Sequence, residues 1–241
     1  MNTSFPRDFA TTRWSLVFNA ANSQSPGHES ALEELCRRYW FPLYAYARHR
    51  GTAHADAEDL VQGFIVSQFL RTNFLQDLHS KKGRFRAFLL ECFKNYSRNE
   101  WKRGCCQKRG GGVDHLPIDW ATADEKYQSQ LVTAETPNRA YDRAWAVALL
   151  EHVLSQLSQE WQAEGKRELF EVLKPCLTRD KDDFSYRAVA NRLKLNEEAT
   201  RAAVMRLRKR YRKLIREEIL KTCGPAQLEE EISSLLNAFS H

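Results

Sequence analysis

Three carboxylates that lie close together in the sequence are the first residues that could do chemistry. Asp56, Glu58 and Asp59 fall near the start of a predicted helix, and carboxylate oxygens can hold a divalent cation that activates water in a nuclease. No histidine or further carboxylate is spaced to complete such a site, and hydrolysis also needs a base. The remaining explanations are placement of acids at a helix N-terminus, which the helix dipole favours, and contact with another protein.

A run of cations around residue 210 is the second candidate. Eight Lys and Arg residues follow one another without an acid between them, so they repel one another unless an anion lies close. DNA phosphates are such anions, and a solvated basic helix face is the alternative explanation. The eight are Arg201, Arg206, Arg208, Lys209, Arg210, Arg212, Lys213 and Arg216.

The residues before this run predict a helix followed by a tight turn. Val189, Ala190 and Leu193 stand at helical spacing, and the small Ala190 allows a second helix to pass close by. We expect Leu195 to plug the core from the turn. Lys194 occupies the turn position where such motifs often carry glycine, so we expect a left-handed or strained backbone there.

The second helix has a clear predicted start. Asn196 is a good N-cap, and Glu197 and Glu198 follow it in the first turn. The apolar face of this helix continues with Val204, Leu207, Tyr211 and Leu214. A helix-turn-helix that ends in a basic run is typical of proteins that bind DNA.

A third candidate lies between residues 81 and 103, where aromatic side chains alternate with bases and amides. This mixture suits single-stranded nucleic acid, because nucleobases stack on aromatic rings while cations hold the phosphates. Phe85, Phe88 and Phe93 share one stripe and are better explained as core. Tyr96 and Trp101 fit either explanation.

Composition limits the class of protein. The 241 residues are 42% hydrophobic and 11% aromatic, enough for folded cores, and a net charge of +6 with a pI near 9.0 favours a polyanionic partner. No apolar run approaches the roughly 20 residues of a membrane span. The N-terminus lacks a positive leader joined to an apolar stretch, so we expect a cytoplasmic protein.

The six cysteines are scattered, with neither a C-x-x-C pair nor a Cys/His spacing that suits zinc. We therefore predict reduced thiols, no metal and no cofactor. Cys105 and Cys106 lie beside several cations that could lower their thiol pKa, so an oxidant-sensing pair is the alternative interpretation.

Nearly every periodic segment is helical, which predicts an all-α fold. The expected helices cover residues 10–20, 28–50, 54–71, 84–104, 139–162, 166–176, 184–193, 196–221 and 226–239. Glycines from Gly110 begin a stretch of weak periodicity that we interpret as a flexible linker. The predicted organisation is a helical domain over 1–109, a linker over 110–138, a helix-turn-helix domain over 139–222 and an amphipathic C-terminal helix over 223–241.

The ordered set of segments resembles a known family. DAEDLVQGF, FRAFLLECFKNYSRNEWKR and SYRAVANRLKLNEEATRAAVMRLRKR resemble region 2.2, regions 2.3 and 2.4, and region 4 of the bacterial sigma factors of the extracytoplasmic-function type. TTRWSLV and YWFPLYAYAR resemble a subgroup common in planctomycetes. The resemblance covers most of the chain and implies a protein that carries out no covalent chemistry but directs RNA polymerase to promoters.

The resemblance also implies roles for the matching residues. The contact with core RNA polymerase, at its β′ clamp helices, falls to Asp56, Asp59 and Gln62; the β flap is the other expected polymerase contact. Binding of the unpaired −10 strand of promoter DNA falls to Lys81, Lys82, Arg84, Lys94, Asn95, Arg98, Lys102 and Arg103. Readout of the −35 duplex falls to Arg201, Ala202, Met205 and Arg206. Phosphate contacts beside that readout fall to Lys209, Arg210 and Arg212.

Several alternatives stay open at this point. A conventional repressor or activator would have a ligand pocket or a coiled-coil seam, and neither stands out. Control by an anti-sigma factor or by a Ser/Thr kinase is raised by the subgroup resemblance alone. The acidic C-terminal helix either caps the preceding domain or folds back on a basic surface and restrains DNA binding. Its apolar face consists of Leu228, Ile232, Leu235, Leu236 and Phe239.

Overall fold

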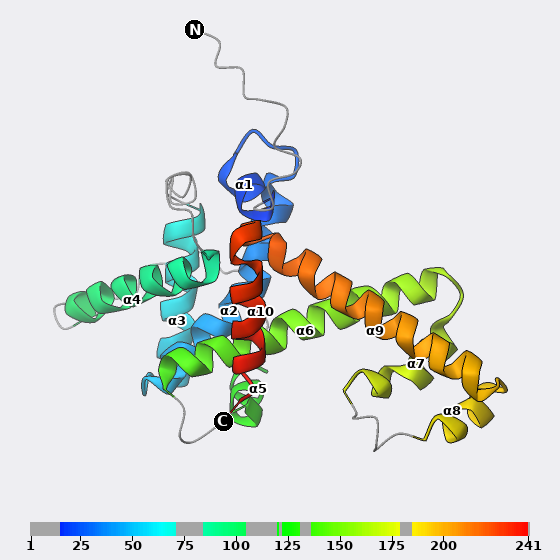
Figure 1. Ribbon diagram of the computed structural model, residues 1–241. Helices are drawn as coiled ribbons and strands as arrows, with labels where there is room; N and C mark the ends of the chain where they lie inside the picture. The colour runs from blue at the N-terminus through cyan, green and yellow to red at the C-terminus, as the bar shows by residue number, and fades with distance from the viewer. Residues whose placement is uncertain are drawn as a thin grey trace, which may run out of the picture. The chain divides into compact units, whose positions relative to one another are not determined.

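The structure is a computed structural model that describes residues 15–70, 84–104, 120, 122–130, 136–178 and 185–240. These residues form helices and no strands, which confirms the predicted all-α class for the described chain (Figure 1). The α-helices are α1 (Ser15–Ala21), α2 (His28–His49), α3 (His54–Ile65), α4 (Phe85–Gly104), α5 (Ala123–Gln130), α6 (Pro137–Ala163), α7 (Arg167–Leu173), α8 (Tyr186–Leu193), α9 (Glu197–Leu220) and α10 (Leu228–Asn237). Shorter helical segments are the π-helix η2 (Val66–Leu70) and the 3-10 segments η4 (Lys174–Leu177) and η5 (Pro225–Gln227).

Most helix bounds follow the periodicity of the sequence. α2 ends one residue before its predicted end, and α9 begins one residue after its predicted start. α5 is the exception, since the weak periodicity of that stretch predicts no helix. None of the described helices is long and apolar enough to cross a membrane.

The chain divides into two compact units. Unit 1 combines residues up to Ala148 with those from Ile219 onward, and unit 2 runs from Leu149 to Glu218. Unit 1 has an aromatic core. Edge-to-face ring pairs join α2 to α4 through Tyr39 and Phe85, with ring centroids 5.3 Å apart, and α3 to α4 through Phe64 and Phe93, at 5.1 Å.

Helix α5 is held on α2 of unit 1 by specific polar contacts. The Asp124 carboxylate lies 2.8 Å from the Arg48 guanidinium and accepts a hydrogen bond of 3.2 Å from the Tyr44 hydroxyl. Trp120 packs edge-on against Trp40, with ring centroids 5.1 Å apart. Asp124, one of the acids between residues 110 and 138, is therefore paired with an arginine of α2.

A buried ion cluster fixes α10 to the start of α4. The Arg86 side chain of α4 donates to Glu231 of α10 at 3.1 Å and also pairs with Asp142 of α6. Its guanidinium carbon lies 4.3 Å from the centre of the Trp145 ring. Arg86 and Glu231 are only 7% and 3% exposed. Burial opposes the charge of Arg86, but the two carboxylates raise its pKa.

Unit 2 consists of the second part of α6 with α7, η4, α8 and most of α9. Its core is aliphatic around one aromatic ring. The buried side chains include Val153, Leu157, Phe170, Leu173, Ala190, Val204 and Leu207. Trp161 packs near Phe170, with ring centroids 6.1 Å apart. The predicted inner faces of α8 and α9 therefore meet in this core, and the opposite face of α9 is left toward solvent.

Candidate nucleic-acid interface

Local hydrogen bonds build the turn between α8 and α9. Ser185 caps α8 by accepting from the Ala188 N–H at 3.3 Å, and Asn196 caps α9 by accepting from the Ala199 N–H at 2.7 Å. Lys194, between the two helices, has φ 54° and ψ 36°. This is the left-handed conformation predicted for it, and it costs a non-glycine residue about 1–2 kcal/mol. The surrounding turn must therefore hold Lys194 in place.

Leu195 does not plug the core, so that prediction was wrong. Leu195 is 41% exposed, whereas Ala190 of α8 and Ala203 of α9 are each only 3% exposed. The Leu195 N–H instead completes the end of α8 by donating to the Ala190 carbonyl at 3.0 Å. The residue contributes its backbone to the turn and presents its side chain to solvent.

The outer face of α9 carries the side chains predicted to read duplex DNA. Met205 is 71% exposed, an unusual position for a large apolar residue. Arg201 and Arg206 are exposed as well, and Ala202 is half-buried. The Arg201 guanidinium lies 5.3 Å from the centre of the Tyr186 ring of α8. The structure therefore brings all four predicted readout residues to one end of α9.

Two of the eight cations of α9 are used inside unit 2. Arg208 donates to the Cys176 carbonyl at 3.0 and 2.7 Å, which ties α9 to η4. Arg210, predicted to hold a phosphate, makes a two-pronged ion pair with Glu160 of α6, and its Nε donates at 2.8 Å. This hydrogen bond lowers the pKa of Glu160. Both arginines thus position the helix whose other cations face outward.

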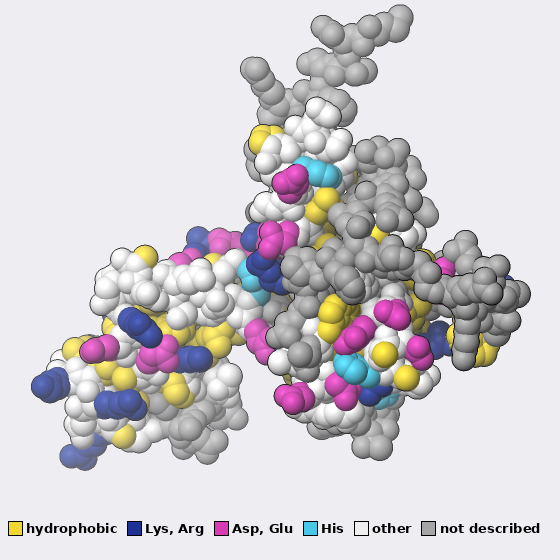
Figure 2. Space-filling view, turned by 180° about the vertical axis from the view of Figure 1, so that it is seen from behind, with side chains coloured by type: hydrophobic (Ala, Val, Ile, Leu, Met, Phe, Trp, Pro, Cys, Tyr) yellow, Lys and Arg dark blue, Asp and Glu magenta, His cyan; other side chains and the backbone are white. Residues whose placement is uncertain are grey.

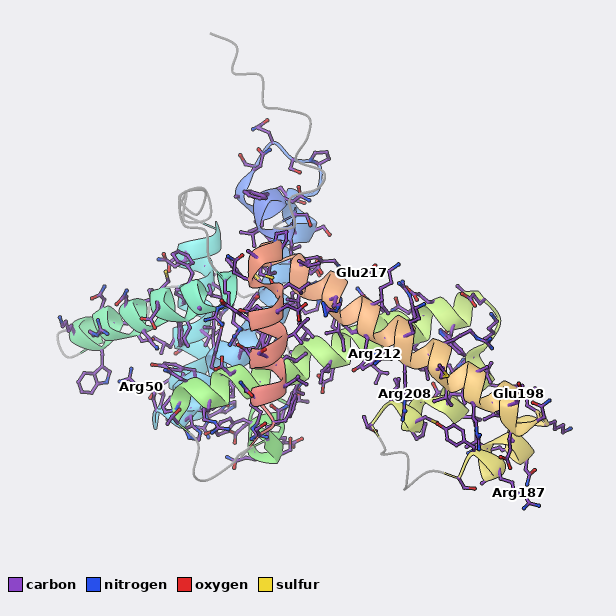
Figure 3. The ribbon with its side chains drawn as sticks, in the orientation of Figure 1. Arg50, Arg187, Glu198, Arg208, Arg212 and Glu217 are labelled. Carbon is purple, nitrogen blue, oxygen red and sulfur yellow. The ribbon has the colours of Figure 1, made fainter. Side chains whose placement is uncertain are left out.

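The other six cations of the run are exposed along α9. They are Arg201, Arg206, Lys209, Arg212, Lys213 and Arg216. Figure 3 shows Arg208 and Arg212 along α9. Arg187 lies on α8, close to the end of α9 that is opposite Glu217. Figure 2 shows Lys and Arg side chains spread over the surface of this unit. Such a field attracts polyanions.

A second cationic face runs along α4 in unit 1. Lys94, Asn95, Arg98 and Lys102 fall within an arc of roughly 100° on the helix, because each residue advances by about that angle. Asn95, Arg98 and Lys102 are exposed. The Arg98 guanidinium donates to the Asn95 side-chain oxygen at 3.2 Å, and Lys94 pairs with Glu91 at 2.7 Å.

The other residues predicted to bind the −10 strand have different positions. Lys81, Lys82 and the side chain of Arg103 lie outside the described residues. Arg84 lies 3.4 Å from the Glu231 carboxylate and donates to the Ser234 hydroxyl at 3.3 Å. Helix α10 therefore engages a cation that the resemblance assigns to DNA.

The predicted polymerase contact is divided between the surface and the interior of α3. Asp56 and Asp59 are exposed, whereas Gln62 is 5% exposed and faces the core. Only Asp56 lies in the first turn, because the helix begins at His54. Glu58 lies 3.1 Å from the His54 ring. Among the described residues, these carboxylates form no group close enough to hold one metal ion.

Comparisons with family models, with curated proteins and with solved structures found no match to the chain. The functional conclusion therefore depends on the residues and on their geometry.

Two acids that shape these faces were missed by sequence reasoning. Glu160 meets Arg210 across 50 residues of sequence, and Glu231 meets Arg86 across 145. Nothing in the sequence around Glu160 indicates that it has an arginine partner. Glu231 did carry a local signal, since it stands on the same helical stripe as Leu228 and Leu235, and an acid within an apolar stripe indicates a buried partner.

The described cysteines are free thiols at Cys36, Cys92, Cys176 and Cys223. Burial raises the pKa of the Cys36 and Cys223 thiols to about 12, so both stay protonated and unreactive at neutral pH. Cys105 and Cys106, the pair with an oxidant-sensing interpretation, lie outside the described residues.

Proposed function

We propose that this chain is a bacterial sigma factor of the extracytoplasmic-function type, which binds core RNA polymerase and directs it to promoters. The observation that carries the proposal is the helix-turn-helix of α8 and α9, with its left-handed turn at Lys194, its capped second helix and its exposed basic face. These features suit insertion of a helix into the major groove. The resemblance of three ordered segments to sigma regions supports the same function.

In this proposal α9 reads the −35 duplex. Arg201 and Arg206 reach base edges or nearby phosphates, and the exposed Met205 makes apolar contact with thymine methyl groups. Lys209 and Arg212 bind phosphates. Arg210 supports this contact by holding α9 to α6 through Glu160.

The cationic face of α4 captures the unpaired −10 strand. Asn95 offers an amide to a flipped nucleobase, while Arg98 and Lys102 hold the adjacent phosphates. Extruding a base costs a few kcal/mol of stacking, and this binding offsets that cost. Core polymerase supplies all covalent chemistry, so the chain acts as a binding protein and needs no cofactor.

The contact with core polymerase uses the exposed carboxylates of α3. Asp56 and Asp59 stand three residues apart, have no ion-pair partner within the described chain, and so remain available to a basic partner surface. The buried Gln62 supports α3 from the inside rather than meeting the polymerase.

Capture of purified bacterial core RNA polymerase tests the proposal. We expect the full chain to bind core polymerase, and Asp56→Ala/Asp59→Ala to weaken binding at least tenfold, since charge complementarity at an interface is lost. Glu29→Ala/Glu33→Ala is the matched control, because it removes two exposed charges from α2 and should leave binding unchanged.

Transcription by the captured complex from a promoter library is the second measurement. Transcripts that share a −10/−35 pattern support the proposal. Failure of the wild-type chain to bind core polymerase at micromolar concentration would overturn it.

A further inference from the structure

A line of polar contacts joins α3 to α5 through the Tyr44 hydroxyl of α2. The Tyr44 oxygen lies 2.7 Å from Nδ1 of His54, the first residue of α3, and 3.2 Å from the Asp124 carboxylate of α5. Nε2 of His54 lies 3.1 Å from the Glu58 carboxylate. The Asp124 carboxylate is also paired with the Arg48 guanidinium at 2.8 Å. These side chains form one line of contacts that runs from Glu58 to Arg48 and contains one imidazole ring.

The Tyr44 hydroxyl has one proton to donate but two neighbours that could accept it. A carboxylate only accepts hydrogen bonds, so Asp124 requires the proton of Tyr44, and Glu58 requires a proton on Nε2 of His54. A neutral imidazole with its proton on Nε2 leaves a lone pair on Nδ1, which competes with Asp124 for the Tyr44 proton. The other tautomer donates to Tyr44 but turns a lone pair toward Glu58. Neutral His54 therefore leaves one contact of the line unmade.

The imidazolium form of His54 satisfies every contact at once. Its Nε2–H donates to Glu58 and its Nδ1–H donates to the Tyr44 oxygen, which leaves the Tyr44 proton for Asp124. Hydrogen bonds with an ionised donor are also the stronger ones. Tyr44 stays a hydroxyl throughout, because burial raises its pKa. The geometry of the line therefore suits the protonated ring.

The charged and titratable groups around His54 come from three helices. α2 contributes Tyr44 and the cation of Arg48, α3 contributes Glu58, and α5 contributes Asp124. Arg48 and the positive end of the α3 dipole oppose a charge on the ring, and both carboxylates favour it. The His54 side chain is 41% exposed, so it exchanges protons with solvent.

Helix α5 depends on these contacts for its place on α2. It has only eight residues, and a helix of that length is marginal without packing. Its buried residues are Ala123 and Tyr127. The Tyr127 hydroxyl lies 3.4 Å from Nδ1 of His49, a second histidine of α2, which is a long contact for a hydrogen bond. One hydrogen bond gained or lost at Asp124 therefore changes how firmly α5 is held.

We propose that α5 is an acid-tightened latch, in which protonation of His54 turns the Tyr44 hydroxyl toward Asp124 and holds residues 123–130 on α2. The proposal goes beyond the proposed function and does not rest on it. The latch is tightest below the pH range in which histidines titrate and loosens as pH rises through that range. A released α5 is too short to stay helical. The pH therefore decides whether this part of the predicted linker is docked or released.

Hydrogen exchange of the full chain, measured over residues 123–130 and corrected for the intrinsic rate at each pH, tests the proposal. We expect α5 to be about tenfold more protected at about pH 6 than at about pH 8, the size of one added hydrogen bond to a charged group. α10, which contains no histidine, should show no such difference.

Three variants assign the effect to its residues. Tyr44→Phe keeps the ring but removes the hydroxyl, and His54→Gln removes the titrating group, so both should abolish the pH dependence of α5 protection. His49→Gln is the matched control, because it removes the other histidine that contacts α5 and should leave the dependence in place.

Three results would overturn the latch. The first is equal protection of α5 at the two pH values in the wild type. The second is a pH dependence that survives in both Tyr44→Phe and His54→Gln. The third is a dependence lost only in His49→Gln, which would assign the response to the contact between His49 and Tyr127.

Discussion

Two arginines, one in each unit, have opposite roles. Arg86 in unit 1 is 7% exposed, pairs with Glu231 and Asp142 and lies over Trp145. Arg212 in unit 2 is exposed and donates to the Arg208 carbonyl of its own helix at 3.3 Å. The first guanidinium is part of the fold, and the second is available to a ligand. A lysine or arginine in the sequence is therefore available to a ligand only where the fold leaves it exposed instead of burying it against carboxylates.

Removing the buried arginine should give the largest effect. We expect Arg86→Met to lower the free energy of unfolding by about 3–5 kcal/mol, because it leaves Glu231 buried without its main partner. Arg212→Met should change stability by less than about 0.5 kcal/mol. Urea denaturation of both variants measures the difference.

A compensating change sharpens that test. Arg86→Met combined with Glu231→Leu should recover much of the loss, since an apolar pair can replace a buried ion pair. Equal losses in the single and double variants would show that Arg86 acts through packing rather than charge.

Removing an exposed arginine of α9 should affect binding and leave folding unchanged. We expect Arg206→Ala to weaken binding to a selected promoter duplex by about 1–3 kcal/mol if it contacts a base edge. Lys213→Ala is a matched control farther along α9, where the Lys213 ammonium lies 3.6 Å from Glu217. Salt titrations by fluorescence anisotropy check the prediction, and equal affinities for the two variants would contradict it.

Loss of the half-exposed ion pair between Arg210 and Glu160 in unit 2 should have the smallest effect on stability. The direction of the pKa shift of Glu160 decides how this effect depends on pH. Arg210 lowers the folded-state pKa of Glu160 below its usual value of 4.5. The pair therefore adds stability above about pH 4.5, and that stability is lost as pH falls through the lower folded-state value.

Thermal unfolding from about pH 6 to pH 3 measures this loss. Glu160→Gln should flatten the acid side of the curve relative to the wild type. Glu164→Gln, a control close by whose carboxylate pairs with Lys166 in solvent, should not. A Glu160→Gln curve parallel to the wild type would contradict the assigned role.

Local chemistry explains which parts of the fold could be predicted. The N-cap at Asn196 and the left-handed turn at Lys194 depend on a few neighbouring residues, and both follow from the sequence. The bounds of the long helices follow from periodicity in the same way. α5 could not be predicted, because its eight residues are held by Arg48 and Tyr44 of a distant helix.

The candidate site was harder to predict than the fold, because exposure depends on distant partners. Helical spacing alone places Arg210 with the other cations of α9, yet Glu160 binds it. Gln62 is likewise buried although its own side chain is polar. The roles assigned to Asp56, Asn95 and Arg206 stay predictions until the polymerase and DNA measurements are made.

The ion cluster of unit 1 also sets an order of events during synthesis. Arg86 leaves the ribosome 145 residues before Glu231, which at typical translation speeds is roughly 7–30 s. Throughout that time the start of α4 is a cationic surface without its α10 partner. A nascent chain can therefore meet nucleic acid or a chaperone before Glu231 pairs with Arg84 and Arg86, a state that the finished protein no longer presents.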